Sequence, residues 1–143
     1  MTTQEIQNEI IEEFSVFDDW MDKYEYLIEI GNTLDAYDDK NKTPSNLIQG
    51  CQSRVWLDAE YKDGRIYFTA DSDAIITKGI IALLIRIFSG KTPDEILQTD
   101  LFFLDKIGLK ENLSPTRANG LVSMIKNIKA YATAFKAKYK NQI

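Results

Sequence analysis

Apolar residues follow a helical period near the N-terminus and alternate with polar residues in the middle of the chain. In segments 5–17 and 18–34 they recur every three or four residues, which predicts two helices joined by a short break at 15–18. Asp18 is the expected N-cap of the second helix. Residues 35–46 lack any period and are rich in turn formers, so they predict a loop.

Strict alternation over 55–61 and 65–70, with Asp63-Gly64 between them, predicts a β-hairpin. The short apolar segment 47–49 precedes it and is expected to form a third strand. Further helices are predicted at about 73–89, from Thr92, at 101–108 and from Ser114 onward.

Asp71 and Asp73 are the expected N-terminal caps of the 73–89 helix. Gly79 inside that helix predicts a close approach between the helix and a strand. The expected fold class is α+β: an N-terminal helical hairpin, a three-stranded antiparallel sheet, and C-terminal helices packed mainly on one face. We expect a single domain over residues 1–143.

The net charge of −5 argues against nucleic acid as a partner, because phosphate binding requires a basic face. No apolar stretch is long enough to cross a membrane. Residues 1–39 hold twelve of the 22 acids and one base, whereas 112–143 hold six bases, Lys140 among them, and no acid. Two interpretations stay open: the terminal helices pair, or one end docks a protein partner.

Cys51 is the only cysteine, and the chain has no histidine. It therefore forms no internal disulfide and no thiolate metal cage by itself, and the commonest general base and metal ligand are absent, so we expect no metal site. A lone cysteine and the lack of an export signal predict the cytoplasm.

A lone cysteine is commonly a small buried apolar residue. Gly50 before Cys51 and the polar pair Gln52 and Ser53 after it are not typical of a core strand. A free thiol is mostly protonated at neutral pH, so chemistry at Cys51 requires activation by backbone amides, a partner protein or a cation. Arg54 and Arg117 are the candidate cations.

Residues 50–56 (GCQSRVW) resemble the cysteine motif of the SufE family, the sulfur-accepting partners of cysteine desulfurases in iron–sulfur cluster assembly. Three more blocks resemble family signatures in the same order: 20–31 (WMDKYEYLIEIG), 71–79 (DSDAIITKG) and 113–121 (LSPTRANGL). The resemblance covers essentially the whole chain. Thr77 stands where the family signature often has valine.

The resemblance implies a fold related to NifU-type scaffolds and a sulfur carrier. Cys51 would accept persulfide sulfur from a SufS-like cysteine desulfurase, stimulate that enzyme and pass the sulfur to a SufB-like scaffold complex. The protein would need no cofactor of its own, because pyridoxal phosphate (PLP) belongs to the desulfurase. It would be an accessory sulfur-transfer protein rather than a stand-alone enzyme.

The resemblance also implies that Gln52, Ser53, Arg117 and Asp73 support the cysteine site, and that the cysteine loop covers an apolar pocket. Val55 and Trp56 are candidates for its wall. The lone thiol suits this chemistry, since persulfide exchange needs no histidine and a second cysteine would release the sulfur as sulfide.

Three alternatives remain. The first is an interaction module that binds a desulfurase and carries a silent cysteine. A cluster scaffold and an independent thiol hydrolase or transferase are the others, and the single thiol and missing histidine argue against both. The sequence leaves open whether the protein is a monomer or a homodimer, and whether Cys51 is buried at rest.

Overall fold

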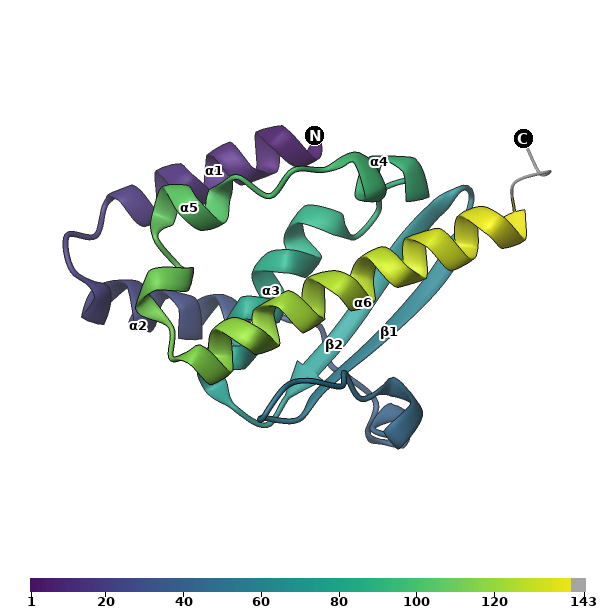
Figure 1. The fold of residues 1–143 in the computed structure, drawn as a ribbon, viewed down its shortest axis with the longest axis horizontal. Helices are drawn as coiled ribbons and strands as arrows, with labels where there is room; N and C mark the ends of the chain where they lie inside the picture. Colours follow the sequence, from purple (N-terminus) through teal and green to yellow (C-terminus); the bar gives the residue numbers. More distant parts are fainter. Residues whose placement is uncertain (140–143) are drawn as a thin grey trace.

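The computed structural model describes residues 1–139 and has the predicted α+β class (Figure 1). Its elements in chain order are α1 (Thr3–Ser15), α2 (Trp20–Gly31), the 3-10 turns η1 (Asp39–Asn41) and η2 (Pro44–Asn46), β1 (Val55–Lys62), β2 (Arg65–Ser72), α3 (Ile75–Phe88), α4 (Pro93–Gln98), α5 (Phe103–Ile107), the 3-10 turn η3 (Lys110–Asn112) and α6 (Pro115–Tyr139).

The β1–β2 hairpin forms as predicted, with Val55 opposite Ser72 and Lys62 opposite Arg65. Asp63 and Gly64 both have positive φ, as the tight turn between twisted strands requires. Alternate residues of each strand are buried beneath the helices, whereas Tyr67 on the other face is 42% exposed. The helices therefore cover mainly one face of the sheet.

The prediction of a third strand is wrong, since the sheet has two strands. Segment 47–49 makes only an isolated bridge, between Leu47 and Trp56. The segment is too short to extend this pairing, because η2 ends at Asn46 and the chain turns at Gly50, where φ is +91°.

Helix starts follow local capping chemistry with small shifts from the predicted positions. Thr2 and Thr92 form capping boxes with Glu5 and Glu95. The cap of α2 is Asp19, which accepts from the Asp22 amide, one residue after the predicted Asp18.

The N-terminal helices reverse direction as predicted (Figure 1). The rings of Phe14 in α1 and Tyr26 in α2 meet edge to face, with their centroids 5.2 Å apart. The largest contact of α2 is with α3. A Cβ at Gly79 would lie 2.2 Å from the Leu27 carbonyl oxygen, so this glycine permits close packing of two helices. The predicted approach of Gly79 to a strand is therefore wrong.

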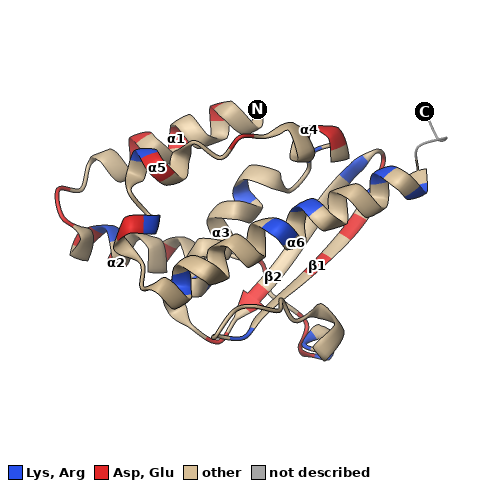
Figure 2. Ribbon diagram, in the orientation of Figure 1, with Lys and Arg blue, Asp and Glu red and all other residues tan. Residues whose placement is uncertain are grey.

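Of the two interpretations of the charge asymmetry, pairing of the terminal helices is wrong, since α1 packs on α5 and α3, whereas α6 packs on α4 and α3. Acids cluster on α1 and α2, and bases lie along α6 (Figure 2). Arg86 of α3 pairs with Glu9 and Glu13 of α1, and Lys136 of α6 lies 2.7 Å from Asp94 of α4. Lys140 lies outside the described residues.

The C-terminal half of α6 is fixed along the hairpin by aromatic side chains. Tyr61 of β1 stacks on Tyr139 at 4.1 Å and on Phe135 at 5.6 Å. Within residues 1–139, none of the helices has the length and apolar character needed to cross a membrane.

Candidate functional site

Cys51 lies on a short loop that enters β1. The loop is closed at its base by the Ile48 amide, which donates to the Val55 carbonyl at 2.8 Å. Between these two residues the chain turns back at Gly50, whose φ of +91° favours glycine. The loop therefore presents Cys51 near its tip.

A second anchor holds the end of the loop at Arg54. Its amide donates to the Asp73 carboxylate at 3.0 Å, and its carbonyl accepts from the Asp73 amide at 3.2 Å and from the Ser72 hydroxyl at 2.8 Å. The predicted capping role of Asp73 is wrong. Ala74 is the N-cap residue of α3 and makes no side-chain cap. Asp73 instead ties the Cys51 loop to the segment between β2 and α3.

The thiol rests against the second turn of α6. Cys51 Sγ donates to the Gly120 carbonyl at 3.5 Å, and a Cβ at Gly120 would lie 3.4 Å from the sulfur. A Cβ at Gly50 would lie 2.4 Å from Ser123 Oγ on the next turn. Two glycines thus allow the loop to lie flat on the helix.

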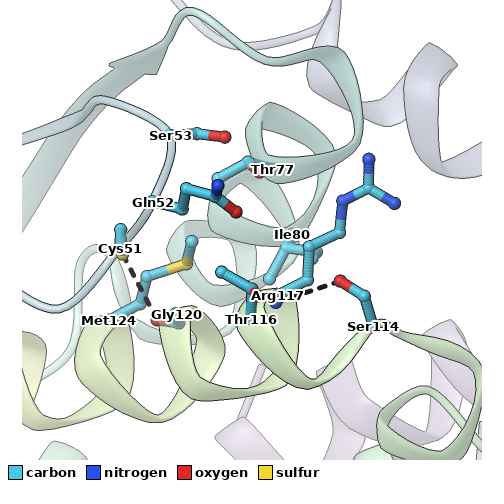
Figure 3. A pocket seen from close by; sticks show the side chains of 10 residues that line it. All are labelled: Cys51, Gln52, Ser53, Thr77, Ile80, Ser114, Thr116, Arg117, Gly120 and Met124. Carbon is cyan, nitrogen blue, oxygen red and sulfur yellow. Dashed lines mark hydrogen bonds between the residues drawn. The ribbon is translucent and has the colours of Figure 1, made fainter.

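A cavity of about 300 Å³ opens beside the thiol (Figure 3). Its lining residues come from the loop, from α3 and from the start of α6: Cys51, Gln52, Ser53, Thr77, Ile80, Ser114, Thr116, Arg117, Gly120 and Met124.

Four of the five predicted site residues line this cavity: Cys51, Gln52, Ser53 and Arg117. Asp73 acts from behind the loop instead. The expectation that Val55 and Trp56 form the apolar wall of the pocket is wrong, because the apolar side chains that line the cavity are Ile80 and Met124.

Burial sets the protonation of the thiol. Cys51 is half-buried, and this burial raises the pKa of its thiol. The Arg117 guanidinium extends away from the sulfur (Figure 3), while its backbone amide donates to the Ser114 hydroxyl at 3.3 Å. In this conformation burial therefore favours the neutral thiol over the thiolate.

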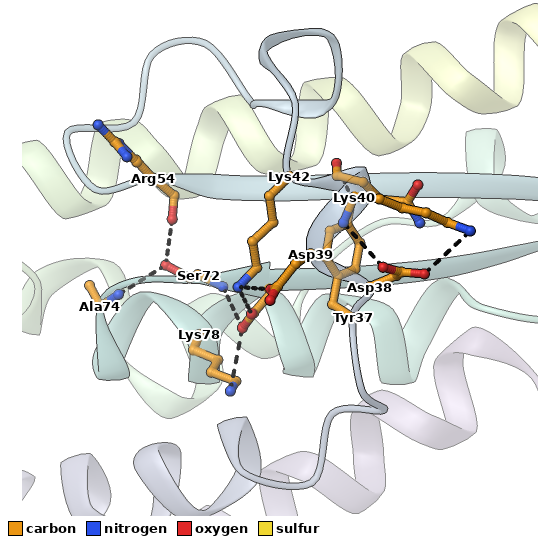
Figure 4. Close-up of polar contacts among 11 residues, drawn as sticks. Tyr37, Asp38, Asp39, Lys40, Lys42, Arg54, Ser72, Ala74 and Lys78 are labelled. Atoms are coloured by element: carbon orange, nitrogen blue, oxygen red, sulfur yellow. Dashed lines mark hydrogen bonds and ion pairs between the residues drawn. The ribbon is translucent and has the colours of Figure 1, made fainter.

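An ionic cluster lies near the end of β2, next to the residues that anchor the Cys51 loop at Arg54 (Figure 4). Asp71 pairs with Lys42 at 3.2 Å and with Lys78 at 3.3 Å. Burial opposes ionisation of Asp71, but the Ser72 amide and the two lysines together hold the pKa of Asp71 below its usual value. Lys42 also lies over the Trp56 ring at 5.3 Å, so Trp56 packs against the 39–42 segment.

Sequence reasoning missed the contribution of α3 and of the α6 glycine. Thr77 and Ile80 are buried on α3, and their spacing alone indicates only a core-facing stripe. Gly120 carried a usable signal, because glycine inside a helix is unfavourable and often marks a close approach. Among residues 1–139, no three or more acidic or cysteine side chains gather in a group that could hold a metal ion.

Comparisons with known proteins agree on one family. The SufE family model, described as an Fe-S metabolism associated domain, matches residues 8–132. An uncharacterized SufE-like protein of Rhizobium meliloti is 45% identical, over 87% of this chain and 93% of that protein. A second, from Synechocystis, is 37% identical, over 88% of this chain and 79% of that protein.

The fold has a solved counterpart. The solution structure of a hypothetical protein from Thermus thermophilus superposes with a TM-score of 0.73. The two share 18% sequence identity, and the match covers 90% of this chain and 94% of the other. This likeness supports the architecture alone.

Proposed function

The chain belongs to the SufE family, which is associated with Fe–S metabolism, and from that premise we propose that Cys51 is a sulfur acceptor. The observation that carries the proposal is the position of this thiol. It is the only thiol of the chain, and it lies near the tip of a closed loop, half-buried at a cavity.

The proposed reaction is an exchange between a thiolate and a persulfide. The Cys51 thiolate attacks the terminal sulfur of a persulfide on a cysteine desulfurase of the SufS type. A bond forms between the two sulfurs, the donor's S–S bond breaks, and the donor cysteine leaves as a thiolate. Its release frees the desulfurase for another turnover, so the protein stimulates that enzyme. PLP chemistry stays on the desulfurase, and this chain acts as an accessory.

The resting geometry suits storage of sulfur better than attack on a protein donor. Cys51 is in contact with Gly120, and burial disfavours its thiolate. We propose that docking draws the 49–53 segment away from α6, which exposes and ionises the thiol. On return, the cavity shields the persulfide from oxidation until it meets a SufB-like scaffold complex. The lone thiol suits a reducing compartment, and the cytoplasm is the proposed location.

Mass spectrometry after incubation with a SufS-like desulfurase and free cysteine tests the proposal. We expect a gain of one sulfur atom on Cys51, and faster cysteine turnover by the desulfurase. A Cys51→Ser variant keeps the fold and loses both effects. If that variant stimulates the desulfurase as well as the parent chain does, the protein is an interaction module with a silent cysteine instead.

A further inference from the structure

The cavity beside Cys51 is lined mainly by groups that donate hydrogen bonds. Its walls carry hydroxyls, the Gln52 amide and one cation, Arg117, and none of its ten lining residues is acidic. A volume of about 300 Å³ is at the small end of ligand pockets, so it suits a ligand of a few heavy atoms. The lining therefore favours a small anion.

The start of α6 adds a positive field at one end of the cavity. Helix α6 has 25 residues and begins at Pro115, and Ser114, Thr116 and Arg117 line the cavity at its first turn. The positive end of the helix dipole therefore faces the cavity. Within residues 1–139 no carboxylate pairs with Arg117, so its charge is not neutralised by the part of the chain described.

Thr77 supplies an independent indication of a ligand. This residue lines the cavity and is only 5% exposed, and its hydroxyl has no hydrogen-bond partner in the described part of the chain. No enclosed side-chain oxygen or nitrogen among the described residues lacks a partner, so the Thr77 hydroxyl is open to the cavity rather than sealed in protein. A ligand oxygen bound there can accept a hydrogen bond from it.

The distance between the cationic end and the thiol suits a compact ligand. Thr116 and Gly120 are one helical turn apart, about 6 Å along the axis. An anion bound at the first turn would therefore place an atom on its far side next to Cys51 Sγ, which contacts Gly120. The thiol is reachable here in its resting position, whereas a protein donor requires the loop to move.

We infer that this cavity binds a small oxyanion that carries a sulfane sulfur, the chemical class of thiosulfate, and that Cys51 takes sulfur from it. The inference rests on the proposed function, because it treats Cys51 as the acceptor. The thiolate attacks the outer sulfur of thiosulfate, an S–S bond forms to Cys51, the S–S bond of thiosulfate breaks, and sulfite leaves with the electron pair. The thiol proton goes to solvent, and no external oxidant or reductant is needed.

A zwitterionic donor such as free cysteine persulfide fits the cavity less well. Its ammonium group needs acceptors, and the lining residues provide no carboxylate for it. The oxyanion uses the donors that are present.

The test incubates the reduced full-length chain with thiosulfate and no desulfurase. We expect one sulfur atom on Cys51 by mass spectrometry and an equal amount of sulfite in solution. Sulfate has a similar oxyanion head and no sulfane sulfur, so it should slow the reaction by competition. Arg117→Gln and Thr77→Val should each reduce the loading rate, the first by about tenfold or more because it removes a charge-assisted contact.

Lys126→Gln is the matched control, since Lys126 is an exposed base on the same helix as Arg117 but does not line the cavity. Loading at parent rates in this variant is expected. The inference is overturned if thiosulfate leaves Cys51 unmodified while a desulfurase loads it, an outcome that preserves the proposed function. Equal loading in the parent chain, Arg117→Gln and Thr77→Val also overturns it, because sulfur would then arrive without the site. If neither donor loads Cys51, both proposals fail.

Discussion

Gly50→Ala should release Cys51 from its resting place on α6. Two features of Gly50 oppose a side chain. Its φ of +91° is unfavourable for any L-residue with a Cβ, and the new Cβ would lie 2.4 Å from Ser123 Oγ. Both costs apply only while the loop lies on the helix, because a freed loop relaxes to ordinary backbone angles and leaves Ser123 behind.

The expected size follows from the backbone term. Holding a non-glycine residue at such an angle costs about 1–3 kcal/mol. Since about 1.4 kcal/mol corresponds to a factor of ten, the population with a freed loop should rise roughly 5- to 150-fold. The clash with Ser123 adds to this unless its side chain rotates. The free energy of global unfolding should fall by no more than the same amount, because the penalty belongs to the seated loop.

The rate of alkylation of Cys51 by iodoacetamide at neutral pH measures the freed population. Gly64→Ala is the control: it has a similar φ of +81°, nothing within 4 Å of the added Cβ, and a position at the hairpin turn. Adding Ser123→Gly to Gly50→Ala removes the clash and leaves the backbone term. The reasoning is refuted if Gly50→Ala and the parent chain react at the same rate, or if Gly64→Ala accelerates alkylation equally.

Other substitutions and the pH dependence test the remaining contacts. Asp73→Ala removes the hydrogen bond from the Arg54 amide, which contributes about 1 kcal/mol to the seated loop, so alkylation of Cys51 should accelerate by about fivefold. An unchanged rate would show that this hydrogen bond does not hold the loop. Gly79→Ala should lower the free energy of unfolding in urea by about 1–3 kcal/mol, because the added Cβ would clash with the Leu27 backbone. Helix propensity alone predicts a higher free energy of unfolding, and that result would contradict the close contact between α2 and α3. Arg86 lowers the pKa of Glu13, so the stability this pair adds is present above the unfolded pKa of the carboxyl and is lost as pH falls through the folded value. The free energy of unfolding of Glu13→Gln, measured by thermal unfolding, should therefore differ from that of the parent by less than about 1 kcal/mol at pH 7, and the two should converge once the pH falls below the lowered pKa of Glu13. Burial raises the pKa of Cys51, so its alkylation rate should keep rising with pH beyond the range where a free thiol levels off, and a profile like that of a free thiol would show that the loop is open at rest.

Local sequence patterns predicted most of the elements because their causes are local. The turn at Asp63-Gly64 needs positive φ at both positions, and the Asp-Gly pair between two alternating segments is typical of such a turn. The first turn of α4 follows from Thr92, Pro93 and Glu95 in the same way. The third strand was overpredicted because the apolar character of 47–49 indicates burial, whereas its pairing is limited by η2 and the Gly50 turn on either side.

Long-range arrangements were less accessible. The role of Gly79 was assigned to the wrong partner, since a glycine indicates a close approach without saying what approaches. At the site, polarity and the family motif indicated Gln52 and Ser53, and the resemblance indicated Arg117. Thr77 and Gly120 enter the cavity only through the packing of α3 and α6 against the loop, which no local pattern records.

The two anchored ends of the cysteine loop limit how far the Cys51 sulfur can move. The chain is fixed at Ile48 and again at Arg54, and α6 is held in place by Tyr61 stacking at its far end. Cys51 is three residues beyond Ile48, and a fully extended chain covers about 3.5 Å per residue, so its tether is about 10 Å long. A swinging arm that crosses between distant active sites is impossible with this length. Each exchange therefore requires the donor's or the acceptor's sulfur-binding residue to come within about 10 Å of this anchor, and the geometry of docking, rather than the mobility of the carrier, should set the rate of sulfur delivery.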